Sequence, residues 1–135
     1  MKKNKQKNMK ILFLDDSDSR WKKFQSKVPC AFRAETAEQC IRMIKERPVL
    51  DFLFLDHDLG GETWVDSGRE DCGMEVVRFL CNNDFTNTIK KIIVHSHNDS
   101  AAREMNAKLN AAGYSSALFP FSYLIENISF NPPED

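Results

Sequence analysis

The sequence lacks several features that would assign it to a well-marked class of protein. No apolar run in the 135 residues approaches the roughly 18 residues of a membrane span. The net charge of −1 gives no overall attraction to nucleic acid or to a membrane surface. There is no signal-peptide pattern, no internal repeat and no helix-turn-helix motif. We therefore expect a cytoplasmic protein with no membrane partner and no dedicated DNA-binding motif.

The chain also lacks paired cysteines. Its four cysteines show no C-x-x-C spacing of the kind that binds zinc or forms a redox pair. They lie mostly among apolar residues, as small core side chains do, and a reducing compartment fits this usage.

The apolar content is sufficient for one core. Hydrophobic residues make up 41% and charged residues 29%, which is ordinary for a globular domain. Residues 1–8 are rich in lysine, asparagine and glutamine, and we predict a disordered basic tail there. Residues 9–131 are predicted to form one domain, and residues 132–135 a C-terminal tail.

Strands and amphipathic helices are predicted to alternate along this domain. Apolar runs predict strands at residues 11–14, 31–34, 51–55, 89–94 and 116–119. Helices are expected after Ser17 or Ser19, after Thr36, from Gly73 and after Ser100, with a short one within 121–130. The alternation predicts an α/β fold with a doubly wound, five-stranded parallel sheet.

Polar residues follow the predicted strands where each apolar run ends. Right-handed crossovers place the carboxyl ends of parallel strands at one edge of the sheet, where ligands bind. That edge collects the following residues: Asp15, Asp16, Asp56, His57, Asp58, His95, Ser96, His97 and Asn98.

Converging carboxylates repel one another and are commonly neutralised by a divalent cation. The predicted metal ligands are Asp15, Asp16, Asp56 and Asp58. Oxygen ligands favour Mg²⁺ or Mn²⁺, with Zn²⁺ as an alternative if histidine takes part. The competing interpretation is that Asp16 or Asp58 only caps a helix or a turn.

The three histidines are candidates for proton transfer. His95 and His97 are two positions apart, so in an extended segment they would point the same way. With His57 or Asp56 they could bind a transition metal, or act as the acid and base that phosphodiester hydrolysis needs. The alternative for His95, nearer the strand, is a hydrogen-bonded structural histidine.

Four further residues could hold a phosphate or a base. Arg20 lies one turn into the first helix and could make a bidentate contact with phosphate, or a surface ion pair instead. Ser96, Asn98 and the helix start that follows could contact the same anion. Trp64, in a polar loop, could stack on a base or only anchor the loop.

These motifs resemble the receiver domains of two-component response regulators. Leu14-Asp15-Asp16 matches their acidic pair, and Leu55-Asp56 matches their phosphoacceptor aspartate. Asp71-Cys-Gly73 resembles their acidic-x-Gly turn, and Ser96 falls at their Ser/Thr position. Phe119 replaces their lysine, however, and the segment from Asp56 to Gly73 is longer than in a usual receiver.

A narrower resemblance covers residues 11 to 120. Three motifs are similar to the cyclic-phosphate processing receiver family of bacteria and phages: Leu-Asp-Asp-x-x-x-Arg, Leu-Asp-His-Asp-Leu-Gly-Gly and Val-His-Ser-His-Asn. The resemblance implies strand order 2-1-3-4-5 and a domain that binds or hydrolyses a cyclic phosphate of a nucleotide or RNA end. Three hypotheses remain open: a phosphoesterase, a module that only binds phosphate, or a receiver phosphorylated on Asp56. The oligomeric state is not predicted.

Overall fold

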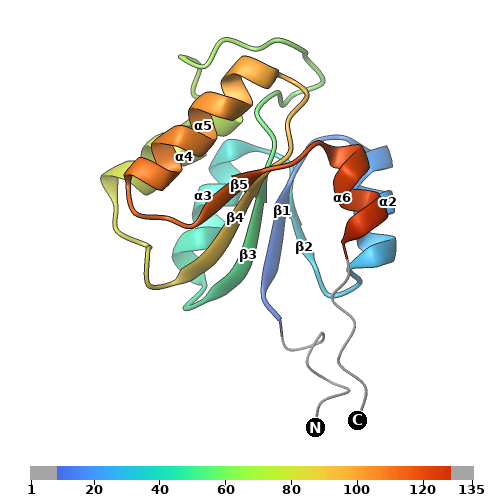
Figure 1. Cartoon of the computed structure of the whole chain (residues 1–135), viewed down its shortest axis with the longest axis horizontal. Coiled ribbons are helices and arrows are strands. Elements are labelled where there is room, and N and C mark those ends of the chain that lie inside the picture. Colours follow the sequence, from blue (N-terminus) through green and yellow to red (C-terminus); the bar gives the residue numbers. More distant parts are fainter. Residues whose placement is uncertain (1–8, 129–135) are drawn as a thin grey trace, which may run out of the picture.

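The computed structural model describes residues 9–128, which fold around one parallel sheet (Figure 1). The strand order is β2-β1-β3-β4-β5, as the sequence predicted. The strands are β1 (Ile11–Leu14), β2 (Phe32–Ala34), β3 (Leu50–Leu55), β4 (Ile89–Val94) and β5 (Ser116–Leu118). The predicted tails at 1–8 and 132–135 lie outside the described residues. No helix within 9–128 is long and apolar enough to span a membrane.

Helices cover both faces of the sheet. They are α2 (Asp18–Lys27), α3 (Ala37–Glu46), α4 (Gly73–Asn82), α5 (Asp99–Ala111) and α6 (Phe121–Asn127). Figure 1 shows α2 and α6 together on one face and α3, α4 and α5 on the other. This two-sided cover explains why the central strands read as continuous apolar runs without alternation.

Two apolar clusters result, one on each face. Leu14 and Leu55 point to the side of α3, α4 and α5. Phe13 and Phe54 point to the opposite side, where Phe13 stacks on Phe24 of α2 with ring centroids 4.2 Å apart. Because β1 and β3 are buried on both faces, the polar residues at their ends are fixed in position by the core.

Side-chain caps set the starts of three helices. Ser17 accepts the backbone N–H of Arg20 at 3.2 Å and begins α2, and Thr36 accepts that of Gln39 at 3.0 Å and begins α3. The predicted Ser100 cap is wrong: Asn98 is the cap of α5 and accepts from Ala101 at 3.4 Å. Asparagine caps a helix as well as serine does, so composition alone does not choose between the two.

Gly73 brings the start of α4 against the end of β3. Its N–H donates to the carbonyl oxygen of His57 at 2.8 Å. A Cβ at this position would lie 1.9 Å from the carbonyl oxygen of Asp56. The backbone therefore tolerates only glycine here, and the close approach helps to fix Asp56.

We expect Gly73→Ala to lower the free energy of unfolding by about 3 kcal/mol, because the new methyl group meets backbone that cannot move aside cheaply. Urea unfolding measures the change. Gly68→Ala is the matched control in the segment that precedes α4, since its Cβ would meet nothing nearer than the Asp66 side chain at 3.6 Å. Equal effects of the two substitutions would contradict this account.

Candidate functional site

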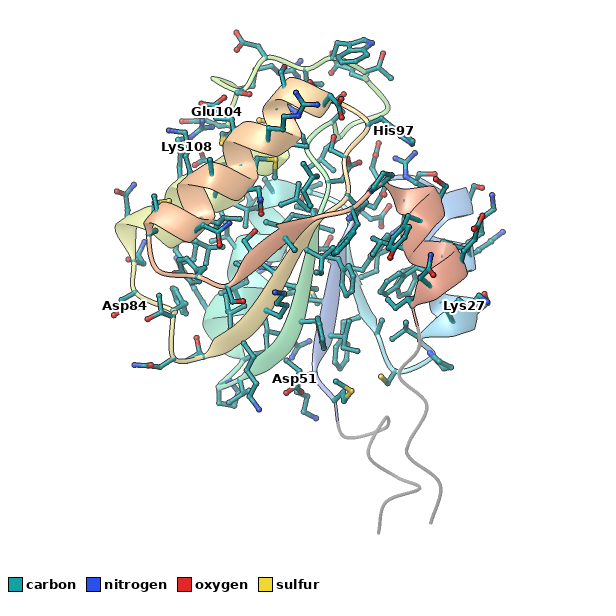
Figure 2. The ribbon with its side chains drawn as sticks, viewed as in Figure 1. Lys27, Asp51, Asp84, His97, Glu104 and Lys108 are labelled. Carbon is teal, nitrogen blue, oxygen red and sulfur yellow. The ribbon has the colours of Figure 1, made fainter. Side chains whose placement is uncertain are left out.

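A pocket of about 300 Å³ lies at the edge where the strands end. His97, labelled in the upper right part of Figure 2, lies on the wall of this pocket. Asp51, labelled near the bottom, lies at the other end of the sheet, at the start of β3. The pocket is lined by Asp16, Ser17, Arg20, Asp56, Asp58, Gly61, Glu62, Thr63, Ser96 and His97. The pocket thus brings together residues that follow β1, β3 and β4, and residues of the loop between β3 and α4.

Asp15 is fully buried and its two oxygens are saturated by hydrogen bonds. Arg20 donates from Nε at 2.7 Å and from Nη2 at 2.9 Å, one bond to each oxygen. The N–H of Ser17 donates at 2.9 Å, and Nε2 of His95 lies at 3.1 Å. A carboxylate has about four lone-pair sites, so none remains free for another ligand.

Asp56 lies beside this ion pair and on the pocket wall. Nη2 of Arg20 is 3.4 Å from its Oδ2, and the backbone N–H of His57 donates to its Oδ1 at 2.8 Å. Burial raises the pKa of Asp56. Burial also favours a higher pKa for Asp15, but the hydrogen bonds from His95 and Arg20 outweigh it and lower that pKa to about 2. Two neighbouring carboxylates therefore share one guanidinium.

His95 is 2% exposed and does not line the pocket. Its ring stacks on Phe13 with centroids 4.9 Å apart. Because Asp15 is ionised, Nε2 of His95 must be the donor in their contact, while Nδ1 is buried without a partner among the described residues. The geometry matches the alternative of a structural histidine that orients Asp15.

His57 is also turned inward and is fully buried. Its Nδ1 lies 2.7 Å from Asp58, and its Nε2 lies 3.0 Å from the hydroxyl of Ser67. Both ring nitrogens are thus engaged, and His57 is not on the pocket wall. The structure places it as the anchor of the loop that follows β3.

Asp58 holds the segment that follows β3 by hydrogen bonds to its backbone. We call this segment, residues 59–72, the β3–α4 loop. Asp58 accepts the backbone N–H groups of Trp64 at 2.7 Å and Val65 at 3.1 Å. The side-chain amide of Asn98 donates to it at 3.2 Å. With His57 added, Asp58 has four donors, so its carboxylate organises the loop and Asn98 faces Asp58 rather than the pocket.

The loop anchor should make stability depend on pH. Burial lowers the pKa of His57, but hydrogen bonds to Cys72 and Asp58 outweigh burial and raise it above 6.5. A raised folded-state pKa stabilises the fold below the unfolded value and loses that effect as pH rises through the folded value. We expect His57→Gln to destabilise more at pH 6 than at pH 9 in urea unfolding. An equal loss at both pH values would contradict the ionised His57–Asp58 contact.

His97 and Ser96 behave differently from each other. His97 is exposed and lines the pocket, whereas His95 is buried and does not. The two side chains therefore do not point the same way, as they would in an extended segment. Residues 95–98 are outside β4, so the period of two does not apply to them. Ser96 is 6% exposed, accepts the N–H of Asn98 at 3.1 Å and hydrogen-bonds Asp56.

One group among the described residues could hold a metal ion: ligand atoms of Asp15, Asp56 and His95 lie within 4.8 Å of one another. Arg20 and its partners already use every lone pair of Asp15, however. Three donors use Oδ1 of Asp58, whereas its Oδ2 accepts only the N–H of Trp64 among the described residues. Asp16 accepts one hydrogen bond from the described residues, donated by the N–H of Gly61 to Oδ2. Asp16, Asp56 and Asp58 are therefore the predicted ligands that keep a free lone pair on the pocket wall, and Asp16 keeps the most.

Sequence reasoning missed several residues of this site. Ser67 holds His57 from ten positions away, and Gly61, Glu62 and Thr63 supply one wall of the pocket. The signals for them were the length of the segment between Asp56 and Gly73 and, for Gly61, the Leu-Asp-His-Asp-Leu-Gly-Gly motif. A polar loop with three glycines does not reveal which of its side chains turn back to the sheet.

The sheet order and the acidic edge define a receiver-type domain. A family model for the cyclic-phosphate processing receiver domain matches residues 10–111. The chain therefore belongs to the cyclic-phosphate processing receiver family.

Solved structures give the same fold. A response regulator receiver protein from Pseudomonas putida has a TM-score of 0.58 and 16% identity, covering 87% of this chain and 93% of its own. A mutant receiver domain of the histidine kinase CKI1 from Arabidopsis thaliana has a TM-score of 0.61 and 15% identity, covering 93% and 92%. A probable two-component system response regulator/GGDEF domain protein has a TM-score of 0.58 and 19% sequence identity. The match covers 88% of this chain and 47% of that protein's chain. The chain thus spans about half of that protein. No curated protein sequence matches closely enough to identify a relative.

Proposed function

We propose that the pocket binds a cyclic phosphate of a nucleotide or an RNA end and hydrolyses it to the phosphomonoester. One observation carries this proposal: a guanidinium, an imidazole and the carboxylates of Asp16, Asp56 and Asp58, each with a free lone pair, line the same small cavity. Anion, base and cation sites are the components that metal-assisted phosphodiester hydrolysis requires.

Arg20 would hold the phosphate. Its Nε and Nη2 groups are committed to Asp15 and Asp56, whereas Nη1 makes no hydrogen bond to any residue within 9–128. Since Arg20 lines the pocket, the two Nη1 hydrogens remain available for a phosphate oxygen. The bidentate contact with Asp15 fixes the plane of the guanidinium before the ligand arrives.

His97 would act as the base. In the proposed step it removes a proton from a water molecule while the water oxygen bonds to phosphorus. The ring P–O bond breaks, and the leaving oxygen takes a proton from solvent in the open pocket. His57 and His95 are set aside from this role, because neither presents a ring nitrogen to the pocket.

A divalent cation would be held by Asp16 and Asp56, with Mg²⁺ or Mn²⁺ preferred for oxygen ligands and Zn²⁺ as the alternative if His97 joins them. When bound, it would offset the negative charge of the phosphate and of the leaving oxygen. Two carboxylates plus substrate oxygens and water are a common arrangement for Mg²⁺.

We expect Asp56→Asn and Asp16→Asn each to weaken Mg²⁺ or Mn²⁺ binding at least tenfold in calorimetry, because each removes one of two charged ligands. Asp51→Asn is the control, since Asp51 lies at the start of β3, whereas Asp56 follows the other end of that strand (Figure 2). If all three variants bind the cation as the wild type does, it is not held at this edge of the sheet.

The function itself is tested by incubating the protein with nucleoside 2′,3′-cyclic phosphates and with RNA ending in a 2′,3′-cyclic phosphate, with and without metal. Appearance of the phosphomonoester supports hydrolysis. Retention of the unchanged ligand identifies a binding module. Absence of both refutes the phosphate pocket.

The second candidate is phosphorylation of Asp56 in a signalling module. It is favoured by the position of Asp56 after β3, hydrogen-bonded to Ser96 on the pocket wall, within a receiver-type fold. Against it, Phe119 stands at the lysine position and stacks on Tyr123 with ring centroids 5.3 Å apart. Labelling of Asp56 by acetyl phosphate, lost in Asp56→Asn, would support this candidate.

A further inference from the structure

We infer that Trp64 is the surface on which the base of the ligand stacks, so that the pocket takes nucleotides or RNA ends in preference to base-free phosphate esters. This inference rests on the proposed phosphate site, and it adds the residue that would recognise the base attached to the phosphate.

Trp64 is unusually exposed for its type. Its exposed fraction is 71%, and no ring or cation within residues 9–128 packs on its indole. Trp21, the other tryptophan, lies 5.9 Å from Phe13 between ring centroids and has the guanidinium of Arg33 6.0 Å above it. The large apolar face of Trp64 therefore contributes nothing to the described core, and its interpretation as a loop anchor is not supported by contacts.

The backbone nevertheless holds Trp64 in one conformation. Its φ of 55° is the only positive value among the non-glycine residues described. Such a conformation is unfavourable for a bulky residue and persists only when its surroundings impose it. Here the Asp58 carboxylate imposes it by accepting the N–H groups of Trp64 and Val65.

Ion pairs and a hydrogen bond also hold the parts of the loop before and after Trp64. Arg69 bridges Glu62 at 3.0 Å and Asp71 at 2.6 Å. Arg78 of α4 donates to the carbonyl oxygen of Ser67 at 2.6 Å. An exposed aromatic ring on a fixed backbone loses little conformational freedom when a ligand covers it.

Trp64 does not itself line the pocket, but it follows three residues that do. Gly61, Glu62 and Thr63, which precede it, line the pocket, and so does Asp58, which binds its N–H at 2.7 Å. Figure 1 shows the β3–α4 loop arching over the edge where the strands end. A volume of about 300 Å³ is at the small end of the usual range for ligand pockets. A ligand whose phosphate lies on Arg20 therefore extends its base to the rim.

The geometry favours a base over other partners. Every nucleobase offers a flat π face, and stacking on an aromatic side chain does not require a particular base. Stacking needs no hydrogen bond to the edge of the base, so a single indole at the rim is sufficient for it. A sugar would also cover an indole. Ribose 5-phosphate, which has the sugar without the base, is therefore measured beside the two ligands below and should bind Trp64→Ala as tightly as the wild type.

The test compares adenosine 3′-monophosphate with glycerol 2-phosphate, two phosphomonoesters of which only the first has a base. Dissociation constants are measured by calorimetry for the wild type, Trp64→Ala and Trp64→Phe, with unfolding curves to verify that each variant folds. We expect Trp64→Ala to weaken the adenosine ligand by ~5- to 150-fold and to leave glycerol 2-phosphate within about twofold. Trp64→Phe, which keeps a ring, should recover most of the loss.

Three results would overturn the inference. Equal weakening of both ligands would mean that Trp64 supports the loop or contacts the ester itself. Unchanged binding of the adenosine ligand would mean that no base stacks there while the phosphate site stands. Failure of the wild type to bind either ligand would refute the phosphate site, and the stacking inference with it.

Discussion

Replacing His97 by alanine is expected to lower the rate of cyclic-phosphate hydrolysis by about 10²–10⁴-fold, the usual cost of losing a general base. The fold should be unaffected, because His97 is exposed and lies past the end of β4. We expect the free energy of unfolding to change by less than about 0.5 kcal/mol, as for other exposed positions. Initial rates and urea unfolding on the same preparation measure both quantities.

The control for His97 is Ser100→Ala, an exposed residue three positions away that does not line the pocket. It should retain full activity. Cation affinity should be measured on His97→Ala as well, because loss of a metal ligand would also lower the rate. If affinity holds while the rate falls, His97 is the base; if both fall, it is a ligand. Full activity of His97→Ala would remove it from the mechanism.

Replacing Arg20 by methionine should have the larger effect on stability. The substitution leaves the buried carboxylates of Asp15 and Asp56 side by side without the cation they share. Removing one partner of a buried ion pair typically costs about 3–5 kcal/mol, and the partial exposure of Arg20 (27% of its side chain) places the expected loss near about 3 kcal/mol. Phosphate binding should be lost as well, because Nη1 disappears.

The loss in Arg20→Met should depend on pH in a defined direction. Asp15 has a folded-state pKa of about 2, below the unfolded value of about 3.9, so its ionisation stabilises the fold above the unfolded value. That contribution disappears as pH falls through the folded value. The difference between wild type and variant should therefore be larger at pH 7 than at pH 3.

Two further variants separate the effect of the bidentate contact of Arg20 from the effect of its charge. Arg20→Lys keeps the charge but cannot make the bidentate contact, so it should be intermediate in both stability and phosphate affinity. Arg103→Met removes an arginine from an exposed pair with Asp99 and should change little. If Arg20→Met unfolds at the same urea concentration as Arg103→Met, the shared guanidinium does not stabilise the carboxylate pair.

The sequence was sufficient for the fold because the signals were local. The apolar runs of β1, β3 and β4 and the alternation with amphipathic helices determine a parallel sheet, and the motifs at the strand ends supply the strand order. The edge at which Asp15, Asp56 and His97 meet follows from the handedness of the crossovers. None of these steps requires knowing where a side chain points.

The role of each residue within the site could not be predicted in the same way. Whether an aspartate binds a cation depends on how many donors already use its oxygens, and those donors come from distant parts of the chain. Asp15 is saturated by Arg20 and by His95, which is 80 positions away. His57 turns inward because Ser67 and Asp58 meet its ring. Composition and spacing contain no information about these contacts.

The most direct test of the proposed function is phosphorus NMR of adenosine 2′,3′-cyclic phosphate mixed with the protein and Mg²⁺, which is diamagnetic. We predict that the cyclic-phosphate resonance is replaced by a phosphomonoester resonance with the wild type, and that it persists with Arg20→Met and with His97→Ala. A cyclic-phosphate resonance that stays unchanged in position, width and intensity with the wild type would contradict both binding and hydrolysis in this pocket.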